Sequence, residues 1–220
     1  MDPSSTSDIN WAFPLPESGL ETARVKLTPF ISHIHWADLG AQLSAHPEIS
    51  HYLPEPITQE FLEGIFGPDP QSILFAVINK EQNVFAGVIG LCNTSPHNLV
   101  TEIGPVICFP EFQRTFVNTN AIGILLRYCL NLPEEGGLGL RRVQWSTHPA
   151  NTASVGAAER MGMTREGTMR WRWVLAKGKE GKEVAPGRGE GPGRDSVMLA
   201  ACWDDWENGG RELVEKQINR

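Results

Sequence analysis

The chain has 220 residues, of which 40% are hydrophobic and 20% charged, and its formal net charge is −7 at pH 7. This composition is typical of a folded globular protein with a sizeable core and excludes a disordered chain. The acidic balance argues against a nucleic-acid partner. No apolar run approaches the ~18 residues of a membrane span, and residues 1–13 lack the pattern of a signal peptide. We therefore expect no membrane partner.

Four cysteines, Cys92, Cys108, Cys129 and Cys202, are widely spaced in apolar surroundings and form no C-x-x-C pair. They predict reduced, buried thiols in an intracellular protein. We expect a cytoplasmic location, with the nucleus as the alternative. Cys108 is interpreted as a buried thiol rather than a nucleophile.

The amino-terminal part predicts an arm, a strand and two helices. The arm covers residues 1–23 and is expected to pack on the domain through Trp11 and Phe13. Alternating apolar residues predict a short strand over 23–30. Helices are expected at 32–46 and 56–67. Their proposed caps and apolar positions are Ser32, Ile34, Leu39 and Leu43 for the first, and Thr58, Phe61, Leu62, Ile65, Phe66 and Gly67 for the second.

The central part predicts a hairpin, a further strand and a long helix. The hairpin strands are expected at 72–80 and 84–93, and the next strand at 101–109. The helix is expected over 120–132, with one continuous buried stripe made of Ala121, Ile124, Leu125, Tyr128, Cys129 and Leu132.

The carboxy-terminal part continues with a strand at 140–147 and a helix at 151–162, capped by Asn151 and ended by Gly162. Strands at 168–177 and 195–203 form a final hairpin, and the tail 204–220 is expected to be helical. The Gly-rich, charged segment 177–193 predicts a mobile loop between these strands. Trp171 and Trp173 are expected to share one strand face, as core or cleft wall.

This order of elements implies an α/β (α+β) domain with a mixed sheet, because hairpins flank one crossover. Between the strand 101–109 and the long helix lies a polar, hydroxyl-rich turn, "PEFQRTFVNTNAI". A helix amino terminus presents unpaired N–H groups and a positive dipole, which suits a pyrophosphate. The alternative is that Thr115 or Asn118 only caps the helix.

Three stretches resemble the GNAT acyltransferase superfamily, specifically its RimJ/RimL-like branch: "TEIGPVICFPEFQRT", "RRVQWSTHPANTASVGAAERMGM" and "TREGTMRW". The resemblance covers roughly residues 24–206, leaving 1–23 as an arm and 207–220 as a carboxy-terminal helix. It implies a mixed central sheet of about seven strands, splayed between the fourth and fifth strands and flanked by helices.

The resemblance implies an acetyl-CoA-dependent N-acetyltransferase without a metal. The acetyl group would pass to a primary amine, of a small molecule or a protein N-terminus, directly within a ternary complex. The acceptor is left open, as is a homodimer. One alternative is a non-catalytic acyl-CoA-binding or scaffold protein of the same fold. Another is an interaction module that dimerises through its arm and final helix.

The resemblance also implies the cofactor contacts. The pyrophosphate would lie on the turn and the helix start, at Gln113, Arg114, Thr115, Phe116, Val117, Asn118 and Thr119. The pantetheine arm would lie along the backbone of Ile107, Cys108 and Phe109, where an N–H faces the thioester oxygen. Asn151 and Ser154 would contact the same arm; the alternative for Asn151 is a plain cap. Phe116 and Asn118 replace family glycines, so we expect the loop to hold phosphate without positive φ.

Glu102, eleven residues before Gln113, matches the position of the general base in family members. The alternative is a strand-end glutamate paired with a surface base. Ala158 stands where the family often has a tyrosine that protonates the thiolate. Tyr52 and Trp145, with His46, are expected to line the acceptor cleft, and the loop 177–193 to cover it. A metal site made of His33, His35, His46, His51 and Glu55 is not expected, because these residues have no convincing metal-ligand spacing.

Overall fold

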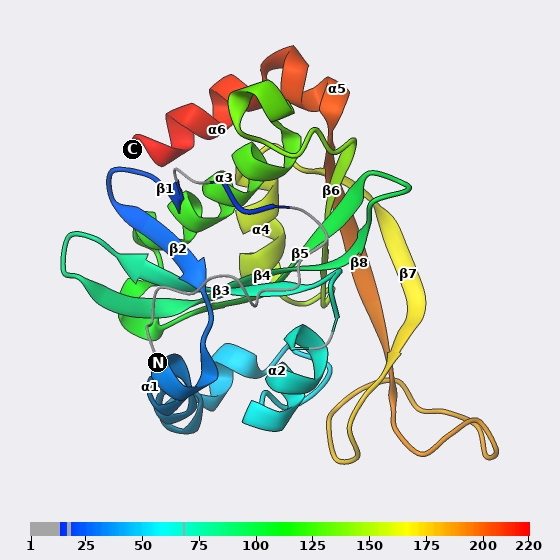
Figure 1. Ribbon diagram of the computed structural model, residues 1–220. Helices are drawn as coiled ribbons and strands as arrows, with labels where there is room; N and C mark the ends of the chain where they lie inside the picture. The colour runs from blue at the N-terminus through cyan, green and yellow to red at the C-terminus, as the bar shows by residue number, and fades with distance from the viewer. Residues whose placement is uncertain (1–13, 17–18, 68) are drawn as a thin grey trace.

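The computed structural model describes residues 14–16, 19–67 and 69–220, so Trp11 and Phe13 of the predicted arm lie outside the described residues. Within this part of the chain, eight strands form one sheet in the order β1-β2-β3-β4-β5-β6-β8-β7 (Figure 1). Their bounds are β1 Leu20–Glu21, β2 Val25–Pro29, β3 Ile73–Asn79, β4 Val84–Ser95, β5 Val100–Cys108, β6 Arg142–Thr147, β7 Thr164–Val174 and β8 Gly193–Cys202.

All neighbouring strands pair antiparallel except β5 and β6, which run parallel. The mixed sheet is therefore confirmed. The described sheet has eight strands instead of the expected seven. The additional strand is β1, which pairs with β2 and brings the end of the predicted arm into the sheet. The turn between β3 and β4 is the predicted hairpin, with Asn83 at φ 55°.

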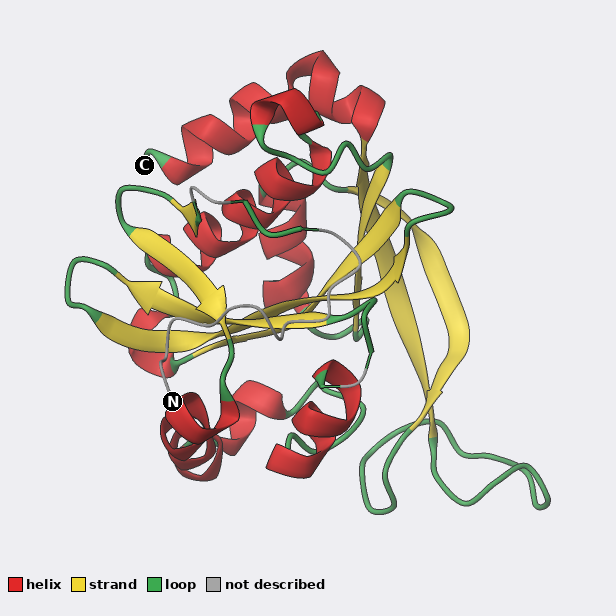
Figure 2. Cartoon of the chain, in the orientation of Figure 1, coloured by secondary structure: helices red, strands yellow, loops and turns green. Residues whose placement is uncertain are grey.

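Helices cover both faces of the sheet (Figure 2), α1 and α2 on one side and α3, α4 and α6 on the other. Their bounds are α1 Ser32–Ala45, α2 Gln59–Phe66, α3 Phe116–Leu130, α4 Thr152–Arg160, α5 Trp203–Asp205 and α6 Arg211–Ile218. Short 3-10 turns occur at Pro47–Ser50, Pro110–Phe112 and Pro133–Glu135. None of the described helices is long and apolar enough to cross a membrane.

Two of the predicted caps are confirmed and one is wrong. The Thr58 hydroxyl accepts from the Phe61 N–H over 3.1 Å, and the Asn151 side chain accepts from the Ser154 N–H over 3.1 Å. Ser32, in contrast, is already the first helical residue of α1, and the extended residue Ile31 precedes it without a side-chain cap. The apolar stripe of α1 is also narrower than predicted, because Ile34 is 49% exposed and only Leu39 is buried.

Helix α3 is the central core helix, and it ends earlier than predicted. Asn131 has extended φ and ψ and Pro133 follows, so the chain leaves the helix and Leu132 is 47% exposed instead of buried. Asn120 fixes α3 to both ends of the chain. Its side chain accepts from the Thr22 hydroxyl over 2.7 Å and donates to the Ile218 carbonyl over 3.3 Å.

The carboxy-terminal part departs from prediction at three points. The tail is not one helix: a π-helical segment at Trp206–Gly210 separates α5 from α6, and Gly209 has a φ of 105°. Trp171 was expected in the core or a cleft wall but is 51% exposed, in a stretch where β7 is irregular and Trp171 has a φ of 56°. All four cysteines are free, as predicted, but only Cys129 is buried, the others being partly exposed.

Candidate active site

The parallel strands β5 and β6 are paired only at their starts. Val100–Glu102 pair with Arg142–Gln144, after which the strands part. On its other side, β5 carries an irregularity opposite β4 at Gly104 and Pro105. The predicted splay is therefore present, and it opens directly after Glu102.

A cavity of about 320 Å³ opens at this gap and collects residues from distant segments. Glu102 and Val106 come from β5, Trp145 and Ser146 from β6, and Tyr52 from the segment between α1 and α2. Its wall also includes Asn151, Ser154, Trp173 and Arg194. The cavity thus unites the predicted base, both predicted acceptor-lining residues and the two residues predicted on α4. His46, also expected here, is not part of the wall.

Glu102 is 6% exposed, and its carboxylate accepts from three neutral donors. The Ser146 hydroxyl donates over 2.6 Å, the Asn93 amide over 3.0 Å and the Gln144 amide over 3.3 Å. A surface base as partner, the alternative reading of Glu102, is therefore wrong. An ionised carboxylate has only acceptor sites, and these donors fit them. None of the three donors was identified from the sequence, because Asn93 lies on β4 and Gln144 and Ser146 lie on β6. They meet Glu102 of β5 only through the pairing of these strands.

Trp145, Asn151 and Ser154 form one connected group beside Glu102. The Trp145 indole N–H donates to the Ser154 hydroxyl over 3.0 Å. Asn151 caps α4 through its side-chain oxygen, so the capping alternative is confirmed. The cap uses only the oxygen of Asn151, and the residue still lines the cavity.

Only part of the predicted pantetheine backbone faces the gap. The Phe109 N–H donates to the Ala86 carbonyl of β4 over 3.0 Å, so Phe109 faces away from β6. Since backbone groups of an antiparallel pair alternate in direction, Ile107 shares this orientation, while Val106 and Cys108 face the gap. The Cys108 carbonyl accepts from the Gln113 side chain over 3.1 Å, consistent with this assignment. Val106, rather than Ile107 or Phe109, therefore shares with Cys108 a backbone that faces the gap.

The start of α3 carries the residues predicted for the pyrophosphate. Gln113, Arg114 and Thr115 are exposed, and α3 begins at Phe116. The Thr115 hydroxyl accepts from the Val117 N–H over 3.3 Å, which confirms it as a cap. The first-turn N–H groups of α3, that of Asn118 included, have no backbone acceptor within the helix.

Arg114 corrects the expectation that this loop avoids positive φ. Its φ is 60°, a left-handed conformation that is uncommon for residues other than glycine. Such conformations concentrate at ligand-binding sites, where the surrounding structure holds them. A second cation nearby was not identified from the sequence. The Arg24 guanidinium lies 3.4 Å from the centroid of the Phe116 ring and pairs with Glu81 over 2.8 Å.

Two residues near the predicted chemistry take no direct part in the cavity. Ala158 is fully buried in the core and does not line the cavity. Burial raises the pKa of the Cys108 thiol to about 12, so this thiol stays protonated near neutral pH. A protonated thiol is a poor nucleophile, which agrees with the interpretation of Cys108 from the sequence.

Arg194, on β8, stands where the cavity meets a larger outer chamber of about 890 Å³. Tyr52, Leu53 and Arg194 line both spaces. The outer chamber is also lined by Gly178, Lys179, Glu180, Gly181 and Lys182 from the long loop between β7 and β8. No sequence pattern indicated Arg194, which follows a Gly- and Pro-rich stretch.

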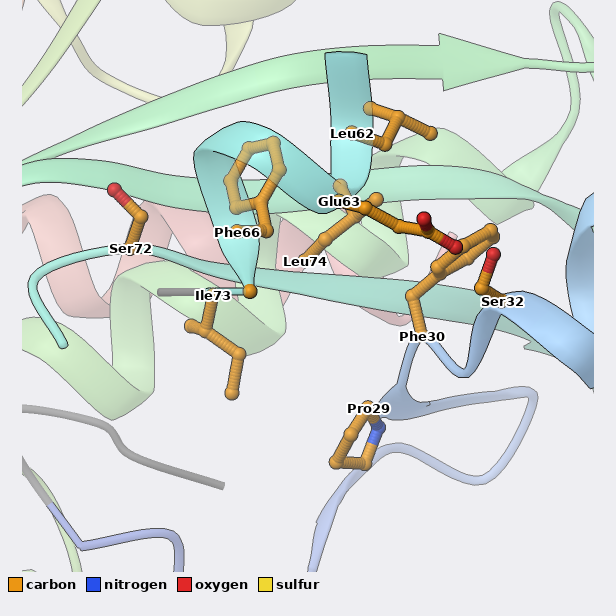
Figure 3. A pocket seen from close by; sticks show the side chains of 10 residues that line it. Pro29, Phe30, Ser32, Leu62, Glu63, Phe66, Ser72, Ile73 and Leu74 are labelled. Carbon is orange, nitrogen blue, oxygen red and sulfur yellow. The ribbon is translucent and has the colours of Figure 1, made fainter. Parts of the chain in front are cut away.

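Two other features lie apart from this site. A cavity of about 220 Å³ between α2 and strands β2 and β3 (Figure 3) shares only Phe66 and Ser72 with the main cavity. Among the described residues, Cys202, Asp204 and Asp205 are the only group with metal-ligand spacing. The histidines discounted as ligands do not form such a group there.

The model of the acetyltransferase (GNAT) domain family matches residues 24–164 of the chain. The chain belongs to the GNAT acetyltransferase family. A crystal structure of a GCN5-related N-acetyltransferase from Brucella melitensis is 26% identical, with a TM-score of 0.73 over 93% of this chain and 87% of that one. A probable GNAT acetyltransferase from Chromobacterium violaceum is 24% identical, with a TM-score of 0.74 over 90% and 92%.

Mycobacterium smegmatis RimJ in complex with CoA-disulfide shares the fold, at 15% identity and a TM-score of 0.66 over 87% of this GNAT chain and 88% of that one. No curated protein matches the chain. The family-matched segment contains Glu102, the gap between β5 and β6 and the α3 start. It ends before Arg194 and the long loop, which therefore belong to the part of the chain outside the family match.

Proposed function

We propose that this GNAT protein transfers an acetyl group from acetyl-CoA to a primary amine within a ternary complex, as a member of the RimJ/RimL-like branch. One observation carries the proposal. Glu102 lies where β5 and β6 part, and its carboxylate borders the cavity that opens there. A buried carboxylate beside a strand gap can accept a proton from an amine that meets a thioester in that gap.

Acetyl-CoA would bind from the α3 side of the sheet. Its pyrophosphate would accept from the first-turn N–H groups of α3, with Arg114 adding a charge-assisted hydrogen bond. The pantetheine arm would lie in the gap against the outward-facing backbone of Val106 and Cys108. Asn151, beside the gap, would donate to the arm through its amide nitrogen.

The reaction would proceed by direct attack. The amine nitrogen forms a bond to the thioester carbonyl carbon as Glu102 takes a proton from it, directly or through water. A β5 backbone N–H facing the gap would stabilise the oxyanion. The carbon–sulfur bond then breaks, and the coenzyme A thiolate leaves. Since Ala158 supplies no hydroxyl, water would protonate that thiolate.

Release of free thiol from acetyl-CoA over a panel of primary amines tests this function. We expect turnover in the wild type and a loss of about 10²- to 10⁴-fold in Glu102→Gln, the range for removing a general base. Glu159→Gln, on the exposed surface of α4, is the matched control and should keep full activity.

Calorimetry with coenzyme A distinguishes the two alternatives, a non-catalytic acyl-CoA-binding protein and an interaction module. Binding without turnover of any amine would favour the non-catalytic acyl-CoA-binding protein. No binding at all would leave only an interaction module.

A further inference from the structure

Arg194 is a buried cation whose guanidinium is only partly used. Its side chain is 6% exposed. One terminal nitrogen, Nη1, donates to the Tyr52 carbonyl over 2.8 Å, while Nε is buried without a hydrogen-bond partner. Within the described residues Arg194 forms no ion pair. Burial of an unpaired guanidinium is costly, and the pKa of Arg194 is accordingly lowered.

None of the nearby acidic groups forms an ion pair with Arg194 among the described residues. Asp195, the next residue, pairs with Lys182 and accepts from the Trp171 N–H over 2.8 Å. Glu55 interacts with the Lys179 ammonium, whose Nζ donates to the Leu53 carbonyl. Glu180 lies on the outer chamber wall, as do His51 and His148. None of these carboxylates serves the free edge of Arg194.

The free edge has the shape of an oxyanion site. With Nη1 held by Tyr52, the Nε and Nη2 donors remain side by side. This edge matches the two oxygens of a carboxylate, and such bidentate pairs are among the strongest hydrogen bonds in proteins. Arg194 lines both the inner cavity and the outer chamber, so an occupant of either space lies next to this side chain.

We propose that Arg194 binds a carboxylate carried by the amine acceptor. The acceptor is then an amino acid-type or peptide-type amine, rather than a polyamine or another purely cationic amine. This inference rests on the proposed function, because it concerns the acceptor of the same cavity. It assigns a specificity role to a residue outside the family-matched segment.

The register of the sheet shows how far the carboxylate site at Arg194 lies from the amine site at Glu102. Ser146, which donates to Glu102, pairs with Met198 of β8, four residues beyond Arg194. At ~3.3 Å per residue, these backbone positions are ~13 Å apart. The Arg194 side chain shortens the distance that the acceptor must bridge. An acceptor whose amine and carboxylate are several bonds apart still fits this distance better than an α-amino acid.

Two matched pairs of acceptors test the proposal in the thiol-release assay: 4-aminobutyrate against butylamine, and 6-aminohexanoate against hexylamine. In the wild type we expect at least one carboxylate member to be preferred by about 10- to 100-fold in kcat/KM, mainly through KM, as for a charged hydrogen bond. Arg194→Gln should reduce that preference to within about three-fold. Arg188→Gln, in the exposed part of the loop, should keep it.

Coenzyme A calorimetry on Arg194→Gln checks that the variant folds. If it does not fold, Arg194→Lys keeps the charge, loses the fork and should lose most of the preference. Equal use of paired acceptors by the wild type, or full preference in an Arg194 variant, would overturn the proposal. The proposed function would survive that outcome, because neutral amines would still be acetylated. It would fail separately if no amine were acetylated.

Discussion

The Ser146 hydroxyl donates to the Glu102 carboxylate over 2.6 Å, across the point where β5 and β6 part. This hydrogen bond connects the two strands just beyond their last paired residues. It also fixes the direction of the carboxylate, whose other oxygen is held by Asn93 and Gln144. Under the proposed function, this bond would position the candidate base towards a cofactor that enters between these strands.

Removal of this hydrogen bond should affect turnover more than folding. We expect Ser146→Ala to lower kcat by about 5- to 30-fold, because a charge-assisted hydrogen bond is worth about 1–2 kcal/mol. Ser44→Ala, which removes a surface hydrogen bond on α1, is the control. An unchanged kcat would show that Ser146 is only structural.

Two substitutions of Arg114, which has a left-handed backbone conformation, distinguish the effect of its charge from the effect of its backbone strain. Arg114→Gly removes the charge and relieves the positive φ, so we expect coenzyme A to bind about ten-fold more weakly without loss of thermal stability. Arg114→Lys keeps the charge in the same strained position and should weaken binding by only a few-fold. Calorimetry and thermal melts provide both readouts. Equal coenzyme A affinity in all three proteins would exclude Arg114 as a phosphate contact.

Cys108 should be dispensable for the chemistry. Cys108→Ala is expected to keep kcat within about two-fold, because the raised pKa leaves little thiolate for a covalent step. The same shift makes a stability prediction. The pKa rises from 9.0 to about 12 on folding, so the protonated thiol favours the folded state and this stability is lost as pH rises from 9 towards 12. Denaturant melts of the wild type and Cys108→Ala across that range measure the difference, which should shrink as pH rises.

Glu166, part of the motif that resembles the family's sixth strand, should be structural. Arg142 of β6 donates Nη1 to Glu166 Oε1 over 2.6 Å and Nη2 to Glu166 Oε2 over 2.5 Å. The pair is partly exposed, so Glu166→Gln should cost about 0.5–1 kcal/mol without changing kcat. Arg142 lowers the pKa of Glu166, so this stability is present above pH 4.5 and is lost as pH falls further. A loss of activity at unchanged stability would assign the motif to the site instead.

Local sequence patterns predicted most of the sheet and helices, because hydrophobic period and capping depend on neighbours in the chain. Thr58 and Asn151 are capping residues whose partners lie three residues on, and both predictions are confirmed. The failures occur where local and tertiary preferences compete. Trp171 is exposed and has a positive φ, and no residue pattern in β7 predicts this backbone conformation.

The sequence by itself determined the order of the elements through their periodicity, the family through the resemblance of three stretches, and the placement of Glu102 near the start of a strand. Only the tertiary structure decided what surrounds that carboxylate. Ser146, Asn93 and Arg194 come from three strands and reach one cavity through sheet pairing and the splay of β5 from β6. Such contacts depend on register and twist, which are set by packing across the whole domain rather than by any short stretch of the chain.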